Sequence, residues 1–164
     1  MRFLFSKFFI LIYYIDNMTK AQDIVFGKAS EDEVIKKLRE KFEDIQNTDK
    51  KDKFDEFDFR SENNKIDLEL KTRNIFKGQY ETIFFGKNKL LEGRKRKANK
   101  ISKRIIYLFR FKSKKHKDKK VVYFWEDKGE EMDIVMCGNY KRNEKAKPLV
   151  NLPIKLLKPL KYLI

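Results

Sequence analysis

The chain has 164 residues and a formal net charge of +15, and its one cysteine and one histidine exclude an internal disulfide and a structural Cys/His zinc site. The length fits one domain with a modest core, to which 15 Phe and 7 Tyr residues can contribute. Such sparse cysteine usage favours a reducing, intracellular setting. Any metal site must then use oxygen ligands, which favours Mg²⁺ or Mn²⁺.

Charge is distributed unevenly along the sequence. Residues 18–70 carry 11 Lys or Arg against 15 Asp or Glu, a net −4, whereas residues 71–164 carry 27 against 9, a net +18. Basic side chains that neutralise phosphates supply most of the non-specific affinity of proteins for nucleic acid. The second half is therefore expected to contact nucleic acid, although a basic surface also fits an anionic membrane or simple solubility.

Residues 1–17 form an aromatic-rich apolar segment, shorter than the roughly 20 residues that a helix needs to span a bilayer. Three interpretations stay open: a translated upstream region before a start at Met18, a membrane or partner anchor, and a secretory signal peptide. The first is preferred, because Met18 opens an ordinary polar, helix-prone segment and no small-residue cleavage site is present. We expect a single domain over residues 18–164 and, with a start at Met18, no stable membrane association.

A helix is predicted over residues 19–46, with an interruption at Gly27 left open. Its apolar stripe recurs at helical spacing and consists of Val34, Ile35, Leu38 and Phe42. Glu31 falls on the same face, where a carboxylate is costly without a partner. Either Glu31 has a functional role, or Ser30 and Glu33 form a capping box and Glu31 merely enters the first turn.

Two short strands joined by a polar turn are predicted between Phe54 and Arg73. Because side chains alternate along a strand, Phe57 and Phe59 are expected on one face and Asp58 on the other. In the second strand the apolar set Ile66, Leu68 and Leu70 opposes the polar set Asp67, Glu69 and Lys71. The hairpin can thus place Asp58 beside a Glu-x-Lys sequence. A polar outer face can also produce this pattern by chance, and a one-residue slip in register would exchange the faces.

The remaining elements follow in order. A turn is expected over residues 74–78, a strand or ordered loop over 80–86, a basic helix over 87–100, strands over 104–111, 121–125 and 134–137, and a linker-like segment over 143–147. His116 is expected in a loop and Cys137 in the core. Candidates for phosphate contact are Lys87, Lys89, Arg94, Lys95, Arg96, Lys97, Lys100 and Arg73. The alternative for the helix is a solvated basic face.

Three features in this order resemble the PD-(D/E)xK nuclease superfamily. Glu31 follows Gly27 on a helix, Asp58 lies between two phenylalanines on a strand, and Glu69-Leu-Lys71 lies on the next strand, before a basic helix and a further strand. The similarity covers residues 27–111. It is greatest to small single-domain members, such as archaeal Holliday-junction resolvases and short nuclease-like proteins of phages and large DNA viruses. Phe57 stands where the family's name has proline, which many members lack.

The resemblance implies an α/β fold with a restriction-endonuclease-like core, a central mixed β-sheet flanked by helices. It implies an Mg²⁺-dependent endonuclease or resolvase-like enzyme that hydrolyses DNA phosphodiester bonds, with Mn²⁺ as an alternative ion. Asp58, Glu69 and the backbone carbonyl of Leu70 would ligate the metal, Glu31 would assist through water, and Lys71 would position the attacking water.

The implied partner is duplex, branched or single-stranded DNA, and a homodimer is left open. The implied location is intracellular, in the cytoplasm, the nucleus or a viral replication site of a host. A second interpretation is a catalytically weak or inactive nuclease fold that binds nucleic acid or a protein partner.

Overall fold

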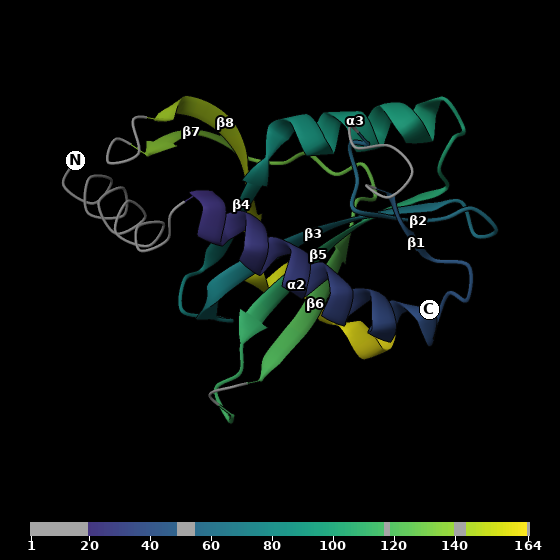
Figure 1. The fold of residues 1–164 in the computed structure, drawn as a ribbon. Helices are drawn as coiled ribbons and strands as arrows, with labels where there is room; N and C mark the ends of the chain where they lie inside the picture. The colour runs from purple at the N-terminus through teal and green to yellow at the C-terminus, as the bar shows by residue number, and fades with distance from the viewer. Residues whose placement is uncertain (1–19, 49–54, 117–118, 140–143, 164) are drawn as a thin grey trace.

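A six-stranded mixed sheet lies between two helices in the computed structural model, which describes residues 20–48, 55–116, 119–139 and 144–163 (Figure 1). The strand order is β1-β2-β3-β5-β6-β9. The bounds are β1 Gln46–Asn47, β2 Phe59–Ser61, β3 Ile66–Phe76, β5 Arg104–Lys112, β6 Lys120–Glu126 and β9 Lys158–Pro159. β3 and β5 pair in parallel and the other neighbours pair antiparallel. The expectation of an α/β fold with a mixed sheet is confirmed.

Each face of this sheet has its own hydrophobic core. Helix α2 (Lys20–Arg39) covers one face with Val34, Ile35 and Leu38, which pack on β3, β5 and β6. Helix α3 (Lys87–Ala98) covers the other face, together with a second sheet of order β4-β8-β7 (Thr82–Gly86, Glu144–Pro153 and Ile134–Asn139). Short 3₁₀ helices η3 (Ile154–Leu156) and η4 (Leu160–Tyr162) flank β9. β3 and β5 are therefore central strands, covered on both faces.

The boundaries differ from the sequence expectations in three places. α2 runs through Gly27 without interruption and ends at Arg39, well before residue 46. β3 continues to Phe76, so the turn expected at 74–78 begins only at Lys77. Residues 144–147 of the linker expected over 143–147 instead begin strand β8, which pairs with both β4 and β7. The apolar segment of residues 1–17 lies outside the described residues, and no helix within the described part is long and apolar enough to cross a membrane.

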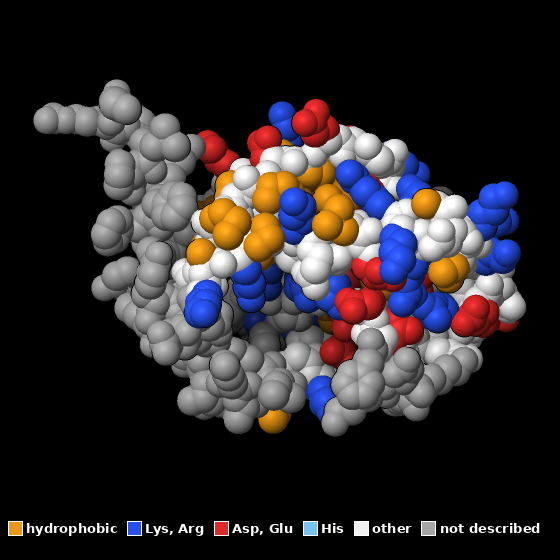
Figure 2. Space-filling view, turned by 90° about the horizontal axis from the view of Figure 1, so that it is seen from above, with side chains coloured by type: hydrophobic (Ala, Val, Ile, Leu, Met, Phe, Trp, Pro, Cys, Tyr) orange, Lys and Arg blue, Asp and Glu red, His pale blue; other side chains and the backbone are white. Residues whose placement is uncertain are grey.

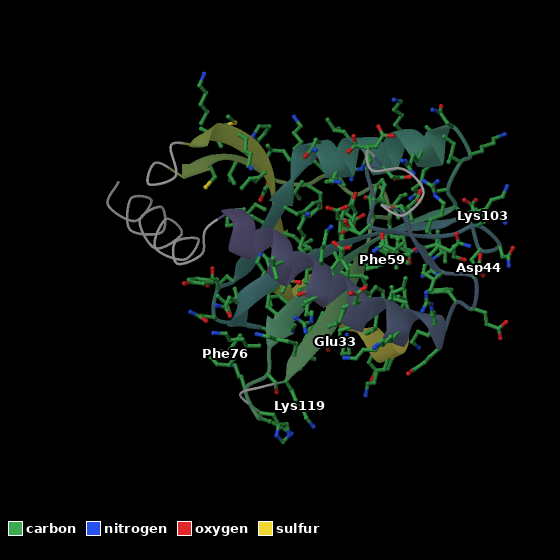
Figure 3. The ribbon with its side chains drawn as sticks, viewed as in Figure 1. Glu33, Asp44, Phe59, Phe76, Lys103 and Lys119 are labelled. Carbon is green, nitrogen blue, oxygen red and sulfur yellow. The ribbon has the colours of Figure 1, made fainter. Side chains whose placement is uncertain are left out.

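Asp44 fixes the turn of the β2–β3 hairpin. Its carboxylate accepts hydrogen bonds from Ser61 Oγ at 2.6 Å and from the backbone N–H of Asn63 at 2.8 Å. Lys65 completes the turn with a positive φ of 52°. Figure 3 shows Asp44 and Phe59 at the same end of the sheet, where these contacts tie the hairpin to the segment that follows α2.

Asp67 anchors α3 to this hairpin. Its carboxylate is fully buried and accepts from Arg60 Nε at 2.7 Å, from Arg96 of α3 at 3.2 Å and from Ser102 Oγ. Arg96 also contacts Asp55 at 3.1 Å. A buried carboxylate is tolerated only when it is paired and hydrogen-bonded, and these contacts meet that condition. The orientation of α3 over β3 therefore depends on a buried ion-pair network.

We predict that Arg96→Ala lowers the free energy of unfolding by about 3 kcal/mol, because it leaves the Asp67 carboxylate buried with one cation fewer. Lys95→Ala is the matched control, since Lys95 is one helix position away and 70% exposed, and it should change stability by less than about 0.5 kcal/mol. Urea denaturation of both variants measures the difference. Equal stabilities would contradict the role assigned to the network.

Candidate active site

Asp58 and Glu69 lie opposite each other across the β2–β3 hairpin. The antiparallel register pairs Phe59 with Leu68, and the next step outward brings Asp58 to Glu69. The backbone N–H of Asp58 donates to Leu68 O at 3.1 Å, and its carboxylate accepts the N–H of Leu70 at 2.7 Å. The side chain of Asp58 thus continues the edge pairing of β3 beyond the end of β2. Backbone pairing therefore places the carboxylates of Asp58 and Glu69 side by side, as the alternation of the two strands predicts.

The expectation that Phe57 and Phe59 share a face is wrong. Residues 56–58 form a bend, and regular strand structure starts only at Phe59. Phe59 packs into the core beneath α2, whereas Phe57 packs into the core beneath α3. Arg96 of α3 lies 5.0 Å from the centroid of the Phe57 ring. The alternation predicted for Ile66, Leu68 and Leu70 is confirmed, since all three belong to the α2 core.

Glu69 is buried and lies between two lysines. The Lys71 ammonium hydrogen-bonds its Oε1 atom. Lys89 Nζ of α3 lies 3.2 Å from its Oε2 atom, an ion-pair distance, but Oε2 accepts no well-directed hydrogen bond within the described residues. Lys89 also donates to the backbone carbonyl of Glu56. A carboxylate that is 1% exposed therefore has an oxygen with remaining acceptor capacity.

A close approach of α3 to β5 positions Lys89. A Cβ on Gly93 would meet Ile105 Cγ2 at 2.8 Å and Tyr107 Oη at 3.0 Å, so only glycine fits the contact. The Tyr107 hydroxyl donates to the carbonyl of Lys89 at 3.0 Å. Sequence reasoning assigned Lys89 to a nucleic-acid surface and missed its place beside Glu69. The sequence feature that could have indicated this contact is the spacing of Lys89, Gly93 and Arg96 at i, i+4 and i+7, which places all three on one helix face.

The surroundings of Asp58 raise the pKa of its carboxyl group. Burial and then the charge of Glu69 raise the pKa of the Asp58 carboxyl from 3.8 to about 7; Glu31 adds a smaller increase, and the Leu70 N–H and Lys71 act in the opposite direction. The three acids are therefore close enough to interact. Glu31 is held by Asn47, whose Nδ2 donates to Glu31 Oε2 at 3.1 Å.

The capping-box alternative for Ser30 and Glu33 is wrong. Both residues lie in the middle of α2, so neither is at a helix N-terminus. Each instead contacts the buried guanidinium of Arg110 on β5: Ser30 Oγ accepts at 3.1 Å, and the Glu33 carboxylate pairs with it. Figure 3 shows Glu33 on α2 over the sheet. Glu31 is thus a mid-helix acid that faces the hairpin.

The donor set suits a small divalent cation in part. Within the described ranges, no group of three or more Asp, Glu, His or Cys side chains converges as a metal site would require. Mg²⁺, however, commonly uses only one or two carboxylates and keeps several waters. Asp58 and Glu69 meet that smaller requirement, because their mutual repulsion favours an added cation and Glu69 Oε2, although near Lys89, accepts no hydrogen bond within the described residues. Glu31 can contribute through water without direct contact.

Most of the basic residues predicted to contact phosphate make internal contacts. Arg94 forms a bidentate pair with buried Asp127 at 3.0 and 2.9 Å, and Lys97 donates to the Asp127 carbonyl at 2.8 Å. Lys95 and Lys100 are exposed, and Lys87 is half-buried. Figure 2 shows basic side chains interleaved with acidic ones over this face. The positive surface of α3 is thus smaller than its composition indicates.

Comparisons of the chain with protein-family models, with curated proteins and with solved structures give no match. The functional interpretation consequently rests on the residues and geometry described above.

We predict that Asp58→Asn stabilises the metal-free protein. Since the folded pKa lies above the unfolded value, the native state binds more protons between about pH 4 and pH 7, so the wild type loses stability as pH rises through that window. The amide escapes this loss and can still accept the Leu70 N–H. A change of one pKa unit corresponds to about 1.4 kcal/mol, and residual solvation of Asp58 reduces the total. We therefore expect a gain in stability of about 2 kcal/mol near pH 8. The gain should shrink towards pH 4.

Urea denaturation in EDTA at several pH values measures this gain. A variant that is less stable than the wild type near pH 8 would contradict the electrostatic description of Asp58.

Proposed function

We propose that the chain is a metal-dependent nuclease of the PD-(D/E)xK type, endonuclease or resolvase-like, that hydrolyses DNA phosphodiester bonds. One observation carries the proposal. Asp58 lies beside buried Glu69, and the ammonium of Lys71 contacts that same glutamate. A carboxylate pair can hold a divalent ion that keeps its waters, and an adjacent lysine can orient such a water next to a phosphate.

The electrostatics support a cation at this place. The raised pKa of Asp58 means that two negative charges here are costly without one. When bound, the ion would lower the pKa of a coordinated water and neutralise charge on the phosphoryl oxygens. Oxygen donors from Asp58, Glu69 and the Leu70 carbonyl suit Mg²⁺ or Mn²⁺.

The chain's own residues have distinct parts in the proposed reaction. The N–H of Leu70 orients the Asp58 carboxylate, and Lys89 restrains Glu69 from the α3 side. Lys71, whose side chain is 28% exposed, can orient water or the scissile phosphate and stabilise the charge that develops on the phosphoryl oxygens in the transition state. Glu31, hydrogen-bonded to Asn47, can hold a water on the α2 side.

A second candidate is a nuclease fold that binds nucleic acid or a protein with little or no catalysis. It is favoured by one observation: both carboxylate oxygens of Glu69 already have a lysine ammonium close by, from Lys71 and Lys89. Two fixed ammonium groups can substitute for a metal ion in neutralising the pair. Under this candidate, DNA binding would fall steeply with salt, and no cleavage would accompany it.

We predict that Glu69→Gln and Lys71→Ala each reduce Mg²⁺-dependent cleavage of DNA by about 100-fold or more, because each removes a group that acts on the transition state. Gel assays with linear duplex, branched and single-stranded DNA, with Mg²⁺ and with EDTA, measure the rate.

Glu62→Gln is the matched control, because Glu62 is an exposed acid in the turn of the same hairpin, and it should keep the wild-type rate. Full activity of the Glu69 and Lys71 variants would exclude the proposed site. Binding without cleavage by the wild type, with Mg²⁺ and with Mn²⁺, would favour the second candidate.

A further inference from the structure

Arg73 follows Lys71 on the α3-facing row of β3, at a break in the strand pairing. Up to Thr72, β3 pairs with β5 residue for residue. Between Thr72 and Phe76, however, β3 advances four residues while β5 advances only two, from Arg110 to Lys112. Such a bulge bends the strand and redirects side chains, and bulges are common beside functional sites. Here it directs Arg73 towards β4, where its guanidinium donates to the Phe84 carbonyl; it also donates to the carbonyl of Thr72.

Arg73 differs from the other arginines that contact the protein interior. Those in the described ranges with buried or half-buried side chains each pair with a carboxylate, namely Arg60, Arg94, Arg96, Arg104 and Arg110. Within the described part of the chain, the guanidinium of Arg73 instead donates hydrogen bonds to two carbonyl oxygens. Burial lowers the pKa of its guanidinium to about 10, and no acid among the described residues opposes the effect. A desolvated cation of this kind is normally paired.

The surroundings of Arg73 are positive. Lys71 is two residues before it on the same strand row, about 7 Å along β3. Phe84, which anchors it, is two residues before Gly86, the N-cap of α3. That helix start has no side-chain cap and no acid in its first turn, so its N–H groups and its dipole favour an anion. Arg73, Lys71 and the α3 N-terminus thus border the same corner of the fold.

We propose that Arg73 is the centre of a phosphate subsite that holds a backbone phosphate of a nucleic-acid strand beside the Asp58–Glu69 pair. The guanidinium has five N–H donors, and the two carbonyls fix its plane while leaving donors for an oxyanion. The identity of the ligand as a nucleic-acid strand rests on the proposed function. The subsite would fix the path of the nucleic-acid strand, so that the phosphate next to the one held by Arg73 lies beside Lys71 and Glu69.

The test is DNA binding in EDTA, where cleavage does not contribute. Fluorescence anisotropy with a labelled duplex of about 20 base pairs is measured between about 50 and about 200 mM salt. Arg73→Gln should bind about 5- to 10-fold more weakly and reduce the slope of log K against log salt by about 1, as expected for one lost phosphate contact. Lys103→Gln removes the same charge from an exposed residue near the hairpin turn (Figure 3) and should bind like the wild type.

The wild-type chain provides a second measurement that does not depend on how the variant folds. This measurement is the Nε–H resonance of Arg73 in a ¹⁵N NMR spectrum, which is assigned by its loss in Arg73→Gln. The resonance should shift when DNA is added. Inorganic phosphate should produce the shift only at a far higher concentration. Tighter binding of inorganic phosphate than of DNA would assign the subsite to a small phosphate compound and overturn the strand assignment.

An unshifted resonance together with equal affinities of the Arg73 and Lys103 variants would overturn the subsite while leaving the proposed hydrolysis intact. Conversely, an Arg73-dependent affinity in a chain that does not cleave DNA would support the subsite and count against the nuclease.

Discussion

The hydrogen bond from the Leu70 N–H to the Asp58 carboxylate is the contact on which the candidate site depends. Regular strand β2 begins only at Phe59, and the backbone N–H of Asp58 bonds to the Leu68 carbonyl one residue before it. The bond from the Leu70 N–H then fixes the direction of the Asp58 side chain. With it, the carboxylate lies beside Glu69, and burial together with the charge of Glu69 raises the pKa of Asp58 to about 7, although the bond itself acts in the opposite direction. Local backbone geometry thus places two carboxylates where a bound cation would be favourable, as the proposed function requires.

Long-range ion pairs then assemble the rest of the site around that contact. Asp67 and Asp55 hold Arg96, Asp127 holds Arg94, and the close approach at Gly93 brings α3 onto β5. Together they place Lys89 against the Glu69 carboxylate. Much of the basic character of α3 therefore serves the fold, whereas Lys71 and Arg73 lie on the α3-facing row of β3 itself.

Sequence patterns predicted the local structure well where alternation or helical spacing was strong. The β-branched and aromatic runs became β5 and β6, the basic segment became α3, and the facing of Leu68 against Glu69 follows from strand alternation. The bend that separates Phe57 from Phe59 was not predictable, because alternation assumes a regular strand. The start of strand β8 was missed because residues 144–147 are mostly polar, and its pairing with β4 and β7 leaves no sign in the sequence. Partners distant in sequence, such as Asp127 for Arg94, leave no periodic signal.

Metal binding tests the central claim most directly, because it asks whether the Asp58–Glu69 pair accepts a cation. Electron paramagnetic resonance of Mn²⁺ titrated with the protein counts bound ions without any substrate. We predict one Mn²⁺ per wild-type chain and loss of that binding in Glu69→Gln. No binding by the wild type, or equal binding by the variant, would contradict the account.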